Sequence, residues 1–234
     1  MPYAPPVSFL VRKGEILGVT GLVGSGKTEL ARALFGIDVM SEGTLLLDGK
    51  PVRIDSPKRA VTFGIGYLSE DRDTDGLCLN MGVKENVSLV LLSKLRSLFF
   101  SIASERRAAG DLVSSIGLKI TGLSQQVKYL SGGNKQKVVF GKWLSAKCRL
   151  LILDEPTMGI DVGARGDIYG LIRNFVAEQD RAVIFISSDV EEILEVSDRI
   201  LVMVGGEMVA DLDSRTTTKQ EIMRTSTRVT QGAG

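Results

Sequence analysis

One octapeptide constrains this chain more than any other feature of its sequence. Residues 21–28 read Gly-Leu-Val-Gly-Ser-Gly-Lys-Thr and fit the pattern G-x-x-x-x-G-K-[ST]. An apolar run at residues 15–20 precedes them, and a segment with helical spacing of its apolar residues, 28–35, follows. The sequence therefore predicts a strand, a glycine-rich loop and a helix in succession, an arrangement typical of phosphate binding.

The residue types in this loop suit a nucleotide phosphate. Its small residues are Gly21, Gly24, Ser25 and Gly26. They allow backbone N–H groups to point into the loop, and the helix N-terminus adds partial positive charge. In such a loop Lys27 reaches the β- and γ-phosphates, and the Thr28 hydroxyl ligates Mg²⁺. We therefore expect the chain to bind a nucleotide together with Mg²⁺.

Two adjacent carboxylates end another apolar run. Residues 150–153 are followed directly by Asp154 and Glu155. A phosphate-binding loop needs an acid at the tip of a neighbouring strand to hold Mg²⁺ through water, and Asp154 fits that requirement. Glu155 can point toward the γ-phosphate and polarise the attacking water as a general base. The pair therefore predicts one metal-holding and one catalytic carboxylate.

A second candidate anion-binding segment is Leu-Ser-Gly-Gly-Asn-Lys-Gln at residues 130–136. Ser131, Gly132 and Gly133 stand before a segment with helical spacing, so a helix N-terminus would again face an anion. Taken alone, the segment also fits an ordinary N-capped helix. One nucleotide does not need two such surfaces in a single domain.

The order of the expected elements indicates an α/β fold. Apolar runs at 64–68, 150–153 and 182–186 are strands, and segments 163–178 and 190–196 are helical, as in the β-α-β-α units of a parallel sheet. The other expected elements are an antiparallel hairpin turning at Asp48 and Gly49, helices at 104–116 and 134–144, a closing hairpin at 199–212 and a last helix at 218–224. We expect a single domain, 1–234, with a helical subdomain inserted at about 84–146.

Composition excludes several functions. The 234 residues include no His, so the chain has no Ser-His-Asp triad and no His-ligated zinc of its own. Cys78 and Cys148 form no C-x-x-C pair, which favours a reducing compartment. A balance of 29 basic and 28 acidic residues argues against nucleic acid as the main partner. Residues 1–6 do not resemble a signal peptide, and Lys94 and Arg96 interrupt the most apolar stretch, so no membrane span is expected.

Together the three motifs resemble the ATP-binding-cassette (ABC) ATPases. The resemblance covers residues 7–225 and rests on 21–28, 130–136 and 151–156 in that order. It implies a P-loop NTPase with a RecA-like parallel-sheet core, an antiparallel β subdomain and a helical insertion. In that family two cassettes pack head to tail around ATP, so Ser131, Gly132 and Gly133 would serve the nucleotide of the other cassette. Asp161 matches the D-loop, which runs along the interface of the two cassettes.

Segments 64–72, 83–86, 153–164 and 186–189 narrow the resemblance to the second ATPase half of bacterial ribose, galactose and xylose importers. Such importers usually carry two fused cassettes, and this chain resembles an excised C-terminal cassette or a short homologue. The resemblance implies transmembrane permease subunits as partners, docking near residues 70–86 and through the helical insertion. It also implies a cytoplasmic location on the inner face of the bacterial cell membrane. Whether the second cassette is identical or a fused sibling stays open.

Three positions depart from the family pattern. Ser188 stands where the switch His is expected, and Glu70 replaces the Gln that approaches Mg²⁺ and water. The aromatic residue that stacks on adenine has only Tyr3 as a candidate. The favoured hypothesis is an ATPase that drives import. Its expected catalytic residues are Lys27, Glu155, Ser188 and Glu70. The alternative is a regulatory half that binds ATP but hydrolyses it weakly. A soluble cassette acting on DNA or ribosomes lacks the basic patch it would need.

Overall fold

The computed structural model describes residues 7–94, 102–178 and 180–227. Its centre is a six-stranded sheet in the order β4-β5-β6-β1-β7-β8, in which the first five strands are parallel and β8 is antiparallel to β7. The strands are β1 (Ile16–Thr20), β4 (Ile65–Leu68), β5 (Leu150–Asp154), β6 (Ala182–Ile186), β7 (Arg199–Val204) and β8 (Glu207–Asp213). The predicted parallel sheet and closing hairpin are thus confirmed. Tyr3 lies outside the described residues.

Strand β1 occupies the middle of the sheet because both of its faces are apolar and buried. Val19 is in register with Ile186 of β6 on one side and with Leu201 of β7 on the other. The sequence placed the strand that ends in Asp154 next to the strand of the glycine-rich loop, and this is wrong. Strand β6 lies between them, so the two functional strand ends are two strand-to-strand spacings apart.

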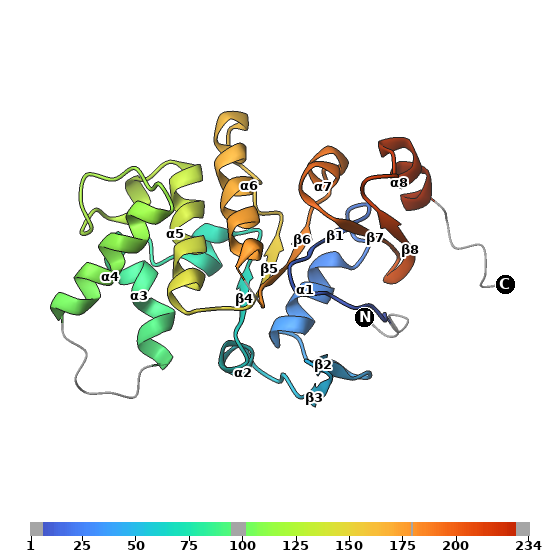
Figure 1. The fold of residues 1–234 in the computed structure, drawn as a ribbon, viewed down its shortest axis with the longest axis horizontal. Helices are drawn as coiled ribbons and strands as arrows, with labels where there is room; N and C mark the ends of the chain where they lie inside the picture. Colours follow the sequence, from blue (N-terminus) through green and yellow to red (C-terminus); the bar gives the residue numbers. More distant parts are fainter. Residues whose placement is uncertain (1–6, 95–101, 179, 228–234) are drawn as a thin grey trace.

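Helices cover both faces of this sheet. Figure 1 shows α6, α7 and α8 above it and α1 below it. These helices are α1 (Lys27–Phe35), α6 (Val162–Ala177), α7 (Val190–Val196) and α8 (Lys219–Ser226). Phe35 of α1 packs against Tyr67 of β4 and, edge to face, against Trp143, with ring centroids 5.4 and 5.8 Å apart. This aromatic cluster fixes the helix that follows the glycine-rich loop to the sheet.

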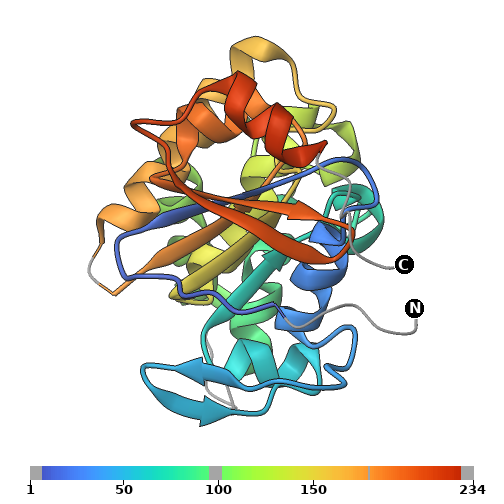
Figure 2. The same cartoon turned by 90° about the vertical axis from the view of Figure 1, so that its right-hand side faces the viewer.

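A small antiparallel ribbon projects from the sheet, as the view in Figure 2 shows. It consists of β2 (Leu45–Leu47) and β3 (Lys50–Val52). Asp48 and Gly49 both have positive φ, 50° and 74°, so the turn is the two-residue type that the Asp-Gly pair predicts. Helix α2 (Pro57–Thr62), which the sequence analysis did not anticipate, begins with proline at its first position and leads into β4.

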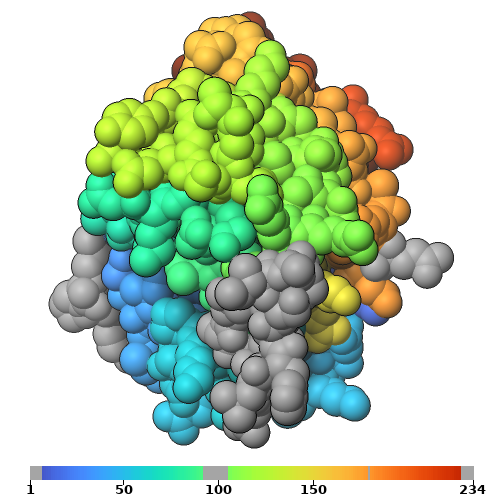
Figure 3. Space-filling model, turned by 90° about the vertical axis from the view of Figure 1, so that its left-hand side faces the viewer, coloured from blue at the N-terminus to red at the C-terminus, as the bar shows by residue number. Residues whose placement is uncertain are grey.

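Three helices gather at the end of the molecule away from β8 (Figure 1), on the face seen in Figure 3. They are α3 (Val83–Lys94), α4 (Ile102–Ser115) and α5 (Gly132–Ser145). Helix α5 contacts α3, α4, α6 and β4, so it joins this group to the sheet. Two short irregular helices, at Arg72–Gly76 and Val127–Tyr129, flank the group and were not predicted. The helices expected within 84–146 are confirmed, whereas their being a separate subdomain stays a prediction.

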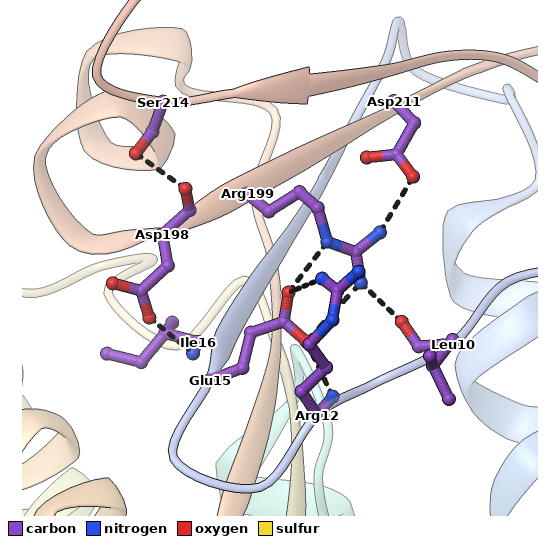
Figure 4. A network of polar contacts seen from close by, with 8 residues as sticks. All are labelled: Leu10, Arg12, Glu15, Ile16, Asp198, Arg199, Asp211 and Ser214. Carbon is purple, nitrogen blue, oxygen red and sulfur yellow. Dashed lines mark hydrogen bonds and ion pairs between the residues drawn. The ribbon is translucent and has the colours of Figure 1, made fainter.

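A polar network ties the first described segment to the far edge of the sheet (Figure 4). The buried Glu15 carboxylate accepts a hydrogen bond from Arg199 Nε at 2.7 Å, and Arg199 also donates to Asp211 at 2.8 Å. Arg12 N donates to the other Glu15 oxygen at 2.6 Å.

Among the described residues, no helix is both long and apolar enough to cross a membrane.

Candidate functional site

The glycine-rich loop has the tight backbone that its sequence predicts. At Gly26, which caps α1, φ is 100°, a conformation that glycine adopts without strain. A Cβ atom at Gly21 would lie 2.2 Å from the carbonyl oxygen of Met203, so no larger residue fits there. The loop is supported from β7 and from the turn that follows it, because the Gly206 N–H donates to the Ser25 carbonyl at 2.9 Å.

Lys27 lies inside this loop. Its ammonium group donates to the carbonyl oxygens of Gly21 and Leu22 at 2.7 and 3.0 Å and to Ser25 Oγ at 3.3 Å. Burial lowers the pKa of Lys27, and the nearby carboxylate of Glu155 counteracts that effect. The Lys27 cation is held by neutral oxygens, and the carboxylates with the largest electrostatic effect on it are Glu155 and Asp154. Phosphate oxygens can therefore take the place of the neutral oxygens.

Asp154, at the end of β5, is fully buried. Its Oδ1 lies 3.4 Å from Thr28 Oγ1, and its Oδ2 accepts a hydrogen bond from the Tyr67 hydroxyl at 3.2 Å. Burial raises the pKa of Asp154 to about 6. Thr28 and Asp154 thus face one another, as the sequence analysis expected of two groups that hold one Mg²⁺. Tyr67 was missed, because a tyrosine in an apolar strand gives no signal of its hydroxyl partner.

Glu155 has an unusual backbone, with φ of 46°. Left-handed backbone is uncommon for a non-glycine residue and is concentrated at functional sites. The conformation turns the carboxylate toward the segment after β6, where Oε1 accepts from the Ser188 N–H at 2.7 Å and Oε2 lies 3.2 Å from Ser187 Oγ. The predicted base is therefore oriented by the backbone N–H of Ser188.

Two adjoining cavities bring half of the predicted residues together. One, of about 350 Å³, is lined by both the glycine-rich loop and the ends of β5 and β6. Its predicted site residues are Gly24, Lys27, Thr28, Glu70, Glu155 and Ser188. The second, of about 550 Å³, shares Thr28 and Glu70 with the first and adds Asp154. Glu70 is exposed and lines both cavities.

The segment at 131–133 lies apart from these cavities. Ser131 Oγ accepts hydrogen bonds from the backbone and side-chain nitrogens of Asn134, at 3.4 and 3.1 Å, and so caps α5. Asp161 caps α6 in the same manner, accepting from Ala164 N at 3.0 Å. Neither Ser131, Gly132, Gly133 nor Asp161 lines either cavity. The structure therefore does not bring these four residues to the glycine-rich loop of the same chain.

Arg72 is a further residue that the sequence analysis missed. Its guanidinium donates to the carbonyl oxygens of Met158 and Gly159, at 2.6 and 3.5 Å. A Cβ at Gly132 would lie 3.1 Å from the same guanidinium. Arg72 therefore joins the segment after β4, the segment after Glu155 and the start of α5. Arg72 is 60 or more positions away from each of these residues in sequence, so no local pattern could have revealed the contacts.

A parallel sheet with a glycine-rich loop after β1 and carboxylates after β5 defines a P-loop nucleotide-binding domain. A cradle of backbone N–H groups, a lysine and a buried acid facing a threonine hydroxyl fit Mg²⁺ and a nucleotide phosphate. Among the described residues, no group of three or more His, Cys, Asp or Glu side chains forms a metal cage of its own.

The family model described as ABC transporter matches residues 5–158. The chain is 47% identical over 222 residues to the ribose import ATP-binding protein RbsA of Geobacillus kaustophilus, covering 94% of this chain and 45% of that protein. It is 42% identical over 231 residues to the ribose import ATP-binding protein RbsA 1 of Rubrobacter xylanophilus, covering 97% and 46%. The chain belongs to the ABC transporter family. It spans about half the length of these curated relatives.

Solved structures show the same fold. The dimeric, post-hydrolysis state of the ATP-binding cassette MJ0796 bound to ADP and Pi superposes with a TM-score of 0.78 at 22% identity, covering 90% of each chain. A nucleotide-free ATP-binding cassette from an ABC transporter superposes with a TM-score of 0.76 at 21% identity, covering 94% of this chain and 87% of that one. The expected fold class is therefore confirmed.

Proposed function

We propose that this chain is the ATP-binding and ATP-hydrolysing cassette of an ABC importer that takes up a monosaccharide. The proposal rests mainly on one observation: Lys27, Thr28, Asp154 and Glu155 line adjoining cavities where strands β1 and β5 end. The curated relatives named as ribose import ATP-binding proteins support the transport role and the sugar.

In this proposal the loop residues bind the phosphates of ATP. Backbone N–H groups of the loop and the Lys27 ammonium contact the β- and γ-phosphates. Thr28, Asp154 and Glu70 are the candidate residues for holding Mg²⁺, which neutralises phosphate charge when it is bound. Tyr67 keeps one Asp154 oxygen occupied, and the other faces Thr28.

Glu155 acts as the general base. Its carboxylate orients a water molecule, which forms the new O–P bond as its proton passes to Glu155 and ADP leaves. The Ser188 N–H holds Oε1 at 2.7 Å, so the base is oriented before substrate arrives. The Ser188 hydroxyl is too short to act as an imidazole would, and water would bridge it to the γ-phosphate.

The active unit would contain a second cassette, either identical or a fused sibling. Ser131, Gly132, Gly133 and Asp161 lie apart from the loop of their own chain, which supports a role at the nucleotide of the other cassette. Exposed apolar side chains support a packing surface near the loop, since Val23, Met158 and Val162 are 94%, 53% and 81% exposed. Transmembrane permease subunits would dock near residues 70–86 and on the α3–α5 helices, on the inner face of the bacterial cell membrane.

The experiment measures ATP affinity and steady-state hydrolysis for the wild type, Lys27→Ala and Glu155→Gln. Lys27→Ala should weaken binding, because the ammonium contacts phosphate in the ground state. Glu155→Gln should retain affinity and lose roughly 10²-fold or more in kcat, as expected when a general base is removed. Unchanged turnover in Glu155→Gln would contradict the assigned base, and a wild type that binds ATP but barely hydrolyses it would favour the regulatory alternative.

A further inference from the structure

A second carboxylate, which is buried, lines the same cavity as the proposed base. Glu192, in the first turn of α7, is only 3% exposed. Among the described residues, no lysine or arginine nitrogen comes within 4 Å of its oxygens. A buried charge without a cation is costly unless hydrogen bonds hold it. The position of Glu192 therefore depends on its hydrogen-bond donors.

Three hydroxyl groups supply those hydrogen bonds. Thr157 and Tyr169 donate to Oε1, the latter at 2.9 Å, and Ser187 donates to Oε2 at 2.6 Å. Burial raises the pKa of Tyr169, so the phenol keeps its proton and remains a donor. The three hydroxyls come from the loop after Glu155, from α6 and from the end of β6. Glu192 thus joins the three segments that surround the proposed base.

The Ser187 hydroxyl faces two carboxylates at once. Its oxygen lies 2.6 Å from Glu192 Oε2 and 3.2 Å from Glu155 Oε2, and it also accepts from Asp189 N at 3.1 Å. A serine hydroxyl has a single proton to donate. Because the contact with Glu192 is much the shorter, that proton lies toward Glu192.

This arrangement leaves the two oxygens of Glu155 in different states. Oε1 is occupied by the Ser188 N–H, whereas Oε2 faces the lone pairs of Ser187 and receives no proton from it. We propose that Glu192 is a positioning residue for ATP hydrolysis, which keeps the Ser187 proton away from Glu155 so that Oε2 stays open to the proton of the attacking water. The inference rests on the proposed function, since it assumes that Glu155 is the base.

The test replaces Glu192 by Gln and measures kcat and ATP affinity separately in the full chain. Oε1 accepts from two hydroxyls, so the amide oxygen should take that place and the amide nitrogen should face Ser187. The nitrogen then donates to Ser187, whose proton turns to Glu155 Oε2 and blocks the base. A hydrogen bond to a charged group of this kind corresponds to a loss of about 10-fold or more in kcat, while ATP affinity stays within about twofold.

A double variant separates this role from a merely structural one. Removing the Ser187 hydroxyl in Ser187→Ala/Glu192→Gln also removes the proton that blocks Glu155, so the double variant should turn over faster than Glu192→Gln alone. If Glu192 only stabilised the fold, the second substitution would add to the damage. Glu191→Gln is the matched control, because Glu191 is the neighbouring carboxylate on α7, exposed and paired with Lys219 at 2.5 Å. Its kcat should equal that of the wild type.

The outcomes distinguish the two proposals. If the wild type hydrolyses ATP and Glu155→Gln does not, but Glu192→Gln keeps full kcat, the positioning role is overturned and the proposed function stands. A double variant no faster than Glu192→Gln also overturns it. If Glu155→Gln keeps full kcat, the proposed base is wrong and the inference fails with it. Should Glu192→Gln not fold by circular dichroism, Glu192→Asp replaces it: a kcat reduced severalfold at unchanged affinity supports the role, and an unchanged kcat overturns it.

Discussion

At the scale of single residues, one oxygen of the proposed base, Glu155 Oε1, is held by the backbone and not by a side chain. Glu155 takes a left-handed backbone conformation, and its Oε1 accepts from the N–H of Ser188. Any residue at position 188 except proline supplies that N–H. The side chain at 188 is therefore free to vary without disturbing the base, and it can be tested by itself.

Ser188→His should raise kcat several-fold with little change in KM. The imidazole would reach the γ-phosphate directly and help to align the attacking water, a gain made mainly in the transition state. Steady-state rates from about pH 5.5 to 9 provide the measurement, since the variant should gain an inflection near the ordinary histidine pKa of ~6.5 that the wild type, with no His, lacks. A variant no faster than the wild type would mean that the serine is an adequate substitute.

Lys142 gives a second prediction at this scale. It is buried on α5 and donates to the Gly76 carbonyl at 2.6 Å, and burial lowers its pKa to about 8. The native state therefore binds fewer protons than the unfolded chain between pH 8 and the ordinary lysine value, so raising the pH through that window stabilises the fold. Relative to Lys142→Met, the wild type should gain about 1–2 kcal/mol in unfolding free energy between roughly pH 7.5 and 9.5. Urea unfolding at both pH values measures it, and parallel profiles for the two proteins would refute it.

At the scale of elements, the network of Figure 4 holds the segment before β1 against β7. Glu15 is 7% exposed and Arg199 is 15% exposed, so this ion pair is largely shielded from water. Its partners are 184 residues apart in sequence. The pair thus joins the segment before β1 to the start of β7.

Arg199→Met should lower the unfolding free energy by about 2 kcal/mol, because the buried Glu15 carboxylate loses its closest guanidinium and keeps only the longer contact with the Arg12 guanidinium at 3.4 Å. Thermal or urea unfolding measures the change. Lys13→Met is the matched control, since Lys13 pairs with Asp180 at 2.6 Å at an exposed site where such pairs contribute little. Equal losses in both variants would show that burial of the pair is not what matters.

Most helices and strands could be predicted from the sequence. The order of the strands in the sheet and the side-chain contacts between distant elements could not. The strand, glycine-rich loop and helix at 15–35 and the Asp48-Gly49 hairpin follow from local pattern and turn chemistry. Strand order does not, and β6 lies where the sequence analysis placed β5. The Tyr67 contact with Asp154 spans 87 positions and the Thr157 contact with Glu192 spans 35. Such contacts arise from tertiary packing, which leaves no periodic signal in the sequence.

At the scale of the whole molecule, the two candidate phosphate-binding segments, 21–28 and 131–133, do not share a cavity. The loop at 21–28 lines the cavities, whereas Ser131 caps α5 elsewhere. In the described part of the chain, the loop at 21–28 thus contributes to a cavity and the surface at Ser131 lines neither of the two. This asymmetry is what a head-to-tail pair of cassettes would require.

Ser131→Arg should abolish cooperative hydrolysis and leave ATP binding to the same molecule intact, because the bulky cation would block only the surface offered to the other cassette. A binding titration beside a curve of rate against protein concentration provides the measurement. Loss of binding equal to the loss of rate would place Ser131 at the site of its own chain and refute the shared arrangement.

The central place of β1 in the sheet has a consequence for the order in which the chain becomes structured. Both neighbours of β1 begin more than 160 residues later, and the turn that supports Ser25 comes at Gly206. During synthesis the loop at 21–28 therefore leaves the ribosome well before β6 and β7, the strands that pair with β1. Contacts of such long sequence separation form slowly. A nucleotide therefore cannot assist folding before β6 and β7 have emerged, and it stabilises only a chain in which both strands have paired with β1.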